Sequence, residues 1–283
     1  MNQLDQAQTT AVQLAQRELG KVWREIEGLP PARQRDILLD VLPAIAAKYS
    51  DVTSVAASEW YQTLWDRHFG DGSGNGFDAL PANPTDDDAL RRIVRAKAGV
   101  LWDIAEGRAD DSAFLTWANG FVDRNVKSGG RTTITANTRR DPHKPRFARI
   151  PSGVRTCPFC LMLASRGAVY ANAETAGGEG HDFHDRCHCE IAPEWGKGGL
   201  DQIDGYDLAL YEKVYFDARK ALENPSTMSK ELRDAVNANA EYTVNLTQKN
   251  GKIRHVTYGA GDQNNLNSLA LVMKAQHPEL FKD

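Results

Sequence analysis

The chain has 283 residues, of which 41% are hydrophobic and 25% are charged, and its formal net charge is −4. This composition is that of an ordinary soluble globular protein with enough residues for one or two domains. The first residues lack the basic-then-apolar pattern of a signal peptide, and no apolar run approaches the roughly 20 residues that a bilayer crossing needs. We therefore expect a soluble protein that is made in a reducing cytoplasm and does not bind membranes.

The first half of the sequence predicts five helices. Apolar residues recur at three- and four-residue steps from Leu4 to Ile26, which is the spacing of a helix with one buried face. Pro30-Pro31 ends this pattern, and Pro43 is expected to kink or shorten the next helix. Ser50 or Asp51 can cap a third helix, and Thr85 a fourth. The expected helices cover residues 4–26, 37–45, 52–65, 86–104 and 111–127, with an exposed loop at 70–84 and the last helix ending at Gly129-Gly130.

The second half of the sequence is less regular. From Arg131 to Gly199 prolines and glycines interrupt the chain, and few apolar stripes remain. Residues 206–223 and 266–273 again have helical spacing, and the alternation over 241–258 around Asn250-Gly251 predicts a β-hairpin. We therefore expect a mainly α protein with three parts: an N-terminal helical bundle (1–130), a basic lead-in with an irregular zinc-knuckle module (131–199), and a small α+β region with a β-hairpin (200–283).

Positive charge is concentrated between Phe121 and Thr156, a stretch with a net charge of +7, so the rest of the chain sums to −11. A solvated connector would explain such a run, and so would contact with phosphate or with an acidic partner. The two interpretations have about equal weight. The residues predicted to bind nucleic acid are Arg139, Arg140, Lys144, Arg146 and Arg149.

All four cysteines lie between Cys157 and Cys189, within 33 residues. Cys157-x-x-Cys160 and His184-x-x-Cys187 have the same two-residue gap, and two such turns supply the four ligands of a tetrahedral zinc site. Cys187-x-Cys189 is the competing second pair and would give a Cys₄ site. We favour the Cys₃His set over the Cys₄ set, with one structural Zn²⁺ per chain that holds an otherwise irregular segment folded.

Two other interpretations of the cysteines remain open. T-C-P-F-C resembles a glutaredoxin-like thiol motif, but the basic, proline-broken residues before Cys157 do not predict the buried strand and βαβ unit that such a motif follows. A catalytic zinc usually keeps one open position, and no H-x-E precedes Cys157 as in the zinc deaminases. A nuclease would use His181, Asp182 and Asp185, for which a solvated loop is the simpler explanation.

The segments "RIPSGVRTCPFCLMLASRGAVY" and "HDFHDRCHCEIAP" resemble the cysteine module of phage minor head proteins. The resemblance is to the phage-Mu-F-like head morphogenesis family, and most to its branch in phages of actinobacteria. It is distinctive from Arg149 to Pro193 and looser in the helices and in the tail after Gly199. Members often carry the H-x-x-C-x-C ending, so Cys187 and Cys189 both match, and the resemblance does not decide which binds metal.

This resemblance implies a non-enzymatic structural protein of the virion, located in the capsid interior or at the portal vertex and present in few copies. Its implied partner is the portal protein, and the major capsid or scaffold protein and the packaged DNA are further candidates. The alternative from a different class is a zinc-dependent nucleic-acid-processing enzyme.

Overall fold

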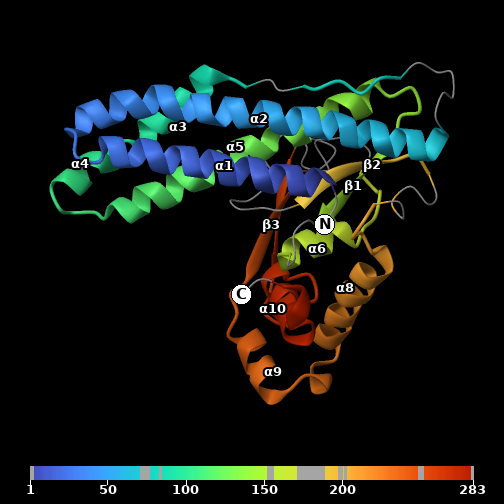
Figure 1. The fold of residues 1–283 in the computed structure, drawn as a ribbon. Helices are drawn as coiled ribbons and strands as arrows, with labels where there is room; N and C mark the ends of the chain where they lie inside the picture. The colour runs from blue at the N-terminus through green and yellow to red at the C-terminus, as the bar shows by residue number, and fades with distance from the viewer. Residues whose placement is uncertain are drawn as a thin grey trace.

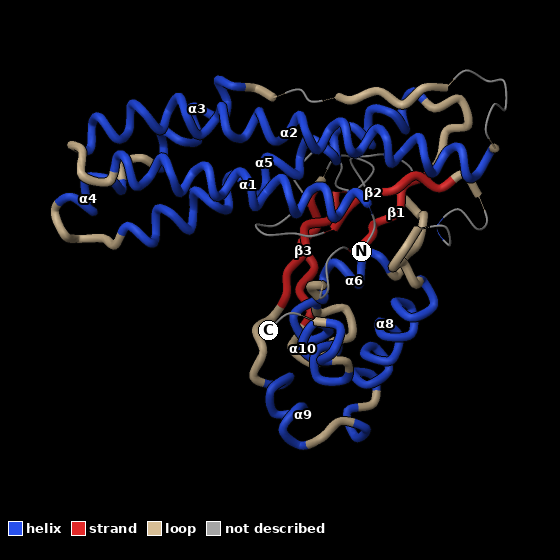
Figure 2. The backbone as a smooth tube through the Cα atoms, in the orientation of Figure 1, coloured by secondary structure: helices blue, strands red, loops and turns tan. Residues whose placement is uncertain are grey.

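The computed structural model describes residues 3–70, 77–82, 85–151, 156–170, 189–196, 200, 203–247 and 252–281. Its architecture is mainly helical, as predicted, and Figures 1 and 2 show long helices lying side by side above a smaller group of short elements. The long helices are α1 (Gln3–Ile26), α2 (Pro31–Phe69) and α5 (Asp111–Arg140). The shorter elements are α3 (Asp87–Lys97), α4 (Val100–Ala105), β1 (Arg146–Pro151), α6 (Pro158–Ala164), β2 (Cys189–Glu194), α8 (Leu208–Glu223), α9 (Lys230–Asn237), β3 (Tyr242–Thr247), β4 (Ile253–Tyr258) and α10 (Leu266–Gln276).

Helix α1 runs antiparallel to both α2 and α5. The C-terminal residue of α1, Ile26, is held by Gln34 near the start of α2, whose Nε2 donates a hydrogen bond to the Ile26 carbonyl at 3.0 Å. In the same region the Trp23 ring stacks on Phe114, near the start of α5, with ring centroids 5.1 Å apart. Most of the apolar stripe predicted for residues 4–26 is confirmed, because Leu19, Trp23 and Ile26 are buried, whereas Leu14 is 43% exposed.

Helix α2 is one helix where the sequence predicted two. It continues through Pro43, although that residue has no N–H to donate to the preceding turn. Ser50 does not cap a new helix; its carbonyl accepts hydrogen bonds from the hydroxyls of Thr53 and Ser54, each at 2.9 Å. Thr53 Oγ1 also lies 2.5 Å from the carbonyl oxygen of Val126 in α5, so its single hydrogen is shared between the two carbonyls. The predicted boundary was wrong because these small polar residues lie in the buried contact between α2 and α5.

Helix α5 continues to Arg140 instead of ending at Gly129-Gly130. These two glycines are not a C-terminal cap; they allow close contact between helices. A Cβ atom at Gly129 would lie 2.4 Å from the backbone oxygen of Ser50, and one at Gly130 would lie 2.6 Å from Gln8 Nε2. The sequence signal for a helix end is therefore a packing signal, because only glycine lets α2 and α1 approach α5 this closely.

The fourth predicted helix is divided into α3 and α4. Asp86, and not Thr85, caps α3 by accepting a hydrogen bond from the backbone N–H of Ala89 at 2.9 Å. Ala98-Gly99, whose backbone angles stay close to helical, separates the two helices. Ile93 of α3 is 49% exposed, although the expected stripe included it.

Part of the predicted exposed loop lies along α5. The backbone N–H of Leu80 donates to Asn137 Oδ1 at 2.9 Å, and Asn137 Nδ2 donates to the Leu80 carbonyl at 2.8 Å. One helical turn earlier, Thr133 Oγ1 accepts from the N–H of Ala82 at 3.0 Å and donates to its carbonyl at 2.8 Å. These bonds satisfy the backbone of residues 80–82, and Phe77 is buried beside them.

A two-stranded antiparallel sheet, β1 with β2, occupies part of the region predicted to be irregular. Arg146 pairs with Glu194 at one end of the ladder and Pro151 with Cys189 at the other. Residues 147–150 and 189–193 are buried, so neither strand shows the alternation that marks a half-exposed strand. The expectation that no buried strand precedes Cys157 was therefore wrong.

The C-terminal residues form the predicted helices and the predicted hairpin of β3 with β4. The helices pack against α6 and share one hydrophobic core with the β1–β2 sheet and the start of α1. The backbone N–H of Thr156 donates to the carbonyl of Leu280 at 3.0 Å, which joins the two chain segments directly. Among the helices that the structure describes, none is long and apolar enough to span a membrane.

The glycines of α5 give a matched test of this packing. Gly129→Ala should lower the free energy of unfolding by about 1–3 kcal/mol, because the new methyl group collides with the backbone of α2. Gly120→Ala in the same helix meets no atom within 4 Å and should raise the stability by about 0.5–1 kcal/mol through helix propensity. Urea unfolding followed by circular dichroism measures both changes, and shifts of the same sign would contradict the packing argument.

Candidate metal site and its supporting residues

Cys157 and Cys160 lie together at the start of α6. Cys157 is the N-cap residue, and its Sγ accepts a hydrogen bond from the backbone N–H of Cys160 at 3.1 Å. The two Sγ atoms are 2.7 Å apart, with Cys157 half-buried and Cys160 buried. The turn at the start of α6 thus directs both sulfurs to one point, as the two-residue gap predicted.

These two sulfurs fit one half of a zinc site in ligand type. With Zn–S bonds of about 2.3 Å, tetrahedral coordination places two sulfurs about 3.8 Å apart, so a small side-chain rotation would separate Cys157 and Cys160 enough. His184 and Cys187, the other members of the favoured set, lie outside the described residues. Within the described part of the chain, no three His, Cys, Asp or Glu side chains are grouped so that they could hold a metal ion. The complete zinc site stays a prediction.

Cys189 belongs to a different element from this pair, because it is the first residue of β2. It is fully buried in the hydrophobic core, and its backbone pairs with Pro151 of β1. Its carbonyl accepts a hydrogen bond from Arg131 Nη2 at 2.9 Å. Among the described residues Cys189 does not complete a three-ligand group with Cys157 and Cys160. Because His184 and Cys187 lie outside those residues, the Cys₃His set and the Cys₄ set both stay predictions.

The strand β1 changes the argument against a thiol oxidoreductase. A buried strand does precede Cys157, and the cysteine pair does open a helix. The sheet, however, is an antiparallel pair of β1 and β2, whereas a thioredoxin-like motif follows a strand of a βαβ unit. Within the described residues, the antiparallel topology of the β1–β2 sheet is therefore what distinguishes this protein from a thioredoxin-like enzyme.

A buried ion pair joins α5 to the strand that begins at Cys189. Arg131 Nη2 lies 3.6 Å from Glu190 Oε1, and the two side chains are 3% and 0% exposed. The sequence placed Arg131 in a basic stretch and gave no sign that Glu190 would be its partner. Two charges this deeply buried are tolerated only when they are paired, so this contact fixes how the sheet sits on the bundle.

Asp141, the residue that follows α5, is the second polar junction that the sequence missed. Its buried carboxylate accepts hydrogen bonds from Tyr61 Oη, from Trp195 Nε1 at 2.9 Å, and from the backbone N–H of His143 at 2.8 Å. Burial and, secondarily, the nearby Asp141 charge raise the pKa of Tyr61 well above its usual value, so this hydroxyl stays protonated and donates. The dipeptide Asp141-Pro142 is a turn signal from which this position could have been found.

The predicted nucleic-acid-binding residues do not all reach the surface. Arg139, Arg140, Lys144 and Arg146 are exposed between the end of α5 and the start of β1. Arg149 is only 3% exposed, because β1 is buried along most of its length, and so the prediction that it contacts nucleic acid is corrected. Lys127 is also buried, with its Nζ 2.8 Å from Asp123 Oδ1. Part of the +7 stretch is therefore interior charge.

Comparison with known proteins places the chain in a family. Residues 1–218 match the VG15 protein family, and the chain belongs to that family. The matched region runs from α1 into α8. The chain is also 40% identical over 58 residues to the Gene 15 protein of Mycobacterium phage D29, a match that covers 19% of this chain and about a fifth (21%) of that protein. No solved structure matches the chain.

These two matches support a phage protein, as the sequence resemblance implied. They do not extend to the phage-Mu-F-like head morphogenesis family, so that finer assignment stays a prediction.

The metal site can be tested by zinc analysis of the purified full-length chain. We expect about one zinc per chain, lost in Cys157→Ser and Cys160→Ser because a tetrahedral site does not survive without a thiolate ligand. Cys189→Ser should retain the metal while lowering stability, since it places a hydroxyl in an apolar core. Chelation should leave most of the helical circular dichroism intact.

Two results would change this picture. Loss of zinc in Cys189→Ser together with retention in His184→Ala would establish the Cys₄ set. A wild-type chain purified under reducing conditions without zinc would remove the metal site altogether.

Proposed function

We propose that this protein is a structural minor capsid protein that acts in head morphogenesis of a tailed phage, at the portal vertex or inside the capsid, without enzymatic activity. The family match over residues 1–218, together with the phage relative, is the observation that carries the proposal. The resemblance of the Cys157–Cys189 window to the phage-Mu-F-like head morphogenesis module supports it. Its proposed main partner is the portal protein, with the major capsid or scaffold protein as further candidates.

In this proposal the zinc is structural. Cys157 and Cys160 would supply two thiolate ligands from the start of α6, and His184 and Cys187 the other two. The metal would contribute folding free energy by linking α6 to the chain segment just before β2. The position of these two cysteines is well supported, because α6 packs against β1, α8 and α10.

Packaged DNA is the second proposed contact. Arg139, Arg140, Lys144 and Arg146 are exposed and close in sequence, at the junction of α5 and β1. Arg140 is held in place by hydrogen bonds to Asn137 Oδ1 at 3.1 Å and to the carbonyl of Asp78 at 3.3 Å. Cations that are positioned in this way neutralise phosphates without reading base sequence.

The competing proposal is a zinc-dependent nucleic-acid-processing enzyme that uses His181, Asp182 and Asp185. These residues lie outside the described part of the chain. The enzyme proposal predicts metal-dependent nicking of DNA that disappears in Asp182→Asn.

Particle composition tests the structural proposal directly. Quantitative mass spectrometry of purified particles, with the portal protein as the internal standard, should find a few to a few dozen copies of this chain per particle. Absence of the chain from both procapsids and virions would refute the structural role and make the nuclease the leading alternative.

DNA contact is tested by the salt dependence of binding. Changing the four exposed cations to glutamine should lower the slope of log K against log salt concentration by up to about 3–4, because each phosphate contact contributes about 0.9. The matched control changes four exposed cations elsewhere to glutamine: Arg33, Arg95, Lys220 and Lys274. Equal slopes in the two variants would rule out a DNA site at the end of α5.

A further inference from the structure

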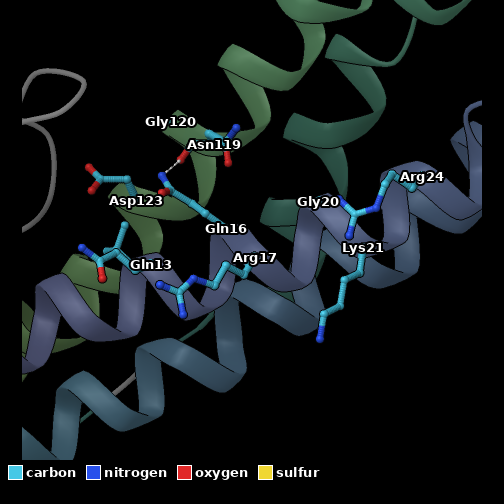
Figure 3. Close-up of a pocket in the computed structure, with 10 residues that line it drawn as sticks. Gln13, Gln16, Arg17, Gly20, Lys21, Arg24, Asn119, Gly120 and Asp123 are labelled. Carbon is cyan, nitrogen blue, oxygen red and sulfur yellow. Dashed lines mark hydrogen bonds between the residues drawn. The ribbon is translucent and has the colours of Figure 1, made fainter.

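A groove runs between α1 and α5 on the outside of the bundle (Figure 3). It has a volume of about 880 Å³. Both helices contribute side chains to it, and Gln16 Nε2 donates across it to the backbone carbonyl of Asn119 at 3.4 Å. Among the described residues, none of the proposed metal or DNA contacts lines this groove. The lining residues are Val12, Gln13, Gln16, Arg17, Gly20, Lys21, Arg24, Asn119, Gly120 and Asp123.

Two glycines in helix interiors line the groove. A Cβ atom at Gly120 would meet no atom within 4 Å, and one at Gly20 would meet only the guanidinium of Arg24, at 3.8 Å. Glycine weakens a helix interior relative to alanine. At Gly129 a close helix contact explains the glycine, but at Gly20 and Gly120 no neighbour among the described residues requires it. The physical use that remains is to let the backbone of another molecule come close to α1 and α5.

Three cations on α1 line the same groove: Arg17, Lys21 and Arg24. All three are exposed, and none forms an ion pair with a carboxylate of the described residues. Other exposed helix cations do form such pairs, with distances of 2.7 Å for Lys48–Glu18 and 2.6 Å for Lys213–Asp217. Lys21 interacts at longer range with Glu18, which is itself paired with Lys48. The lining still carries a net positive charge, because its carboxylate Asp123 is paired with Lys127, and this charge favours an occupant with negative charge.

The spacing of the cations indicates the shape of that occupant. Positions 17, 21 and 24 follow one face of α1 over about 10 Å. Carboxylates at the same i, i+4, i+7 spacing on a second helix would face them when that helix lies along the groove. The α5 side offers the neutral side-chain amide of Asn119 and a carboxylate, Asp123, that is already paired with Lys127. Nucleic acid would be better served by cations on both sides, so this arrangement favours a protein helix.

We propose that the α1–α5 groove is the docking site for an acidic helix of another protein, which lies on Gly20 and Gly120 and pairs its carboxylates with Arg17, Lys21 and Arg24. The docked helix would complete a bundle with α1, α2 and α5. This proposal rests on the proposed function only for the choice of phage-producing cells as the source of the partner.

Photocrosslinking in those cells tests the proposal. Gln13, an exposed residue that lines the groove, is replaced by p-benzoylphenylalanine, and the crosslinked peptides are identified by mass spectrometry. We expect crosslinks to one other protein, on a helix with carboxylates at i, i+4 and i+7. Changing Arg17, Lys21 and Arg24 to glutamate should reduce the crosslink yield at least tenfold. Gly120→Gln, which fills the groove without changing its charge, should reduce it as well.

The matched control changes three exposed cations outside the groove to glutamate, Arg33, Arg95 and Lys274, and should keep the yield within twofold. Crosslinks to DNA, to a second copy of this chain or to no molecule would overturn the proposal, as would equal losses in the charge-reversal variant and its control. Particle composition is measured separately. Absence from particles with the expected crosslinks in cells would refute the proposed function and leave the docking site standing.

Discussion

The close contact between α5 and its neighbours at Gly129 and Gly130 is the constraint on which the rest of the structure depends. A side chain at Gly129 would collide with the backbone of α2, and so glycine at this point decides that α5 runs on beside α2. The continued helix carries Arg131, Thr133 and Asn137 past the bundle. Each of these residues then makes a contact that no shorter helix could reach. One local steric requirement thus sets the path of the chain over several turns.

The polar contacts along this extension join the helical bundle to the sheet. Arg131 reaches Glu190 and the carbonyl of Cys189 in β2, while Asp141 gathers hydrogen bonds from α2 and from Trp195 just after β2. Both junctions are buried, so their geometry is strict: a buried charge or carboxylate without its partners costs several kcal/mol. Asn137 and Thr133 hold residues 80–82 against the same helix. The end of α5 therefore organises three separate segments of the chain.

This arrangement explains how β1, β2 and α6 are held in place within a segment rich in proline and glycine. Helix α5 packs against the β1–β2 sheet through β2. Helix α6 carries Cys157 and Cys160, and it packs against β1 and against α8 and α10. Exposed cations lie at the α5–β1 junction, and a second set lines the α1–α5 groove. Two charged surfaces and a cysteine pair on a rigid support suit the proposed structural role in a phage particle.

The sequence by itself determined the features that depend on neighbouring residues. The amphipathic stripe of residues 4–26, the C-terminal helices, the hairpin around Asn250-Gly251 and the convergence of Cys157 with Cys160 all follow from periodicity or from short spacing. Only the tertiary structure decided the rest. Gly129-Gly130 and Ser50 have the same local sequence signals as helix ends. They are packing residues instead, because Gly129 faces Ser50 of α2 and Gly130 faces Gln8 of α1. β1 and β2 are buried along most of their length and so lack alternation. Arg131 pairs with Glu190 of β2, a residue that lies far from it in the sequence. These outcomes depend on long-range contacts, which local sequence patterns do not encode.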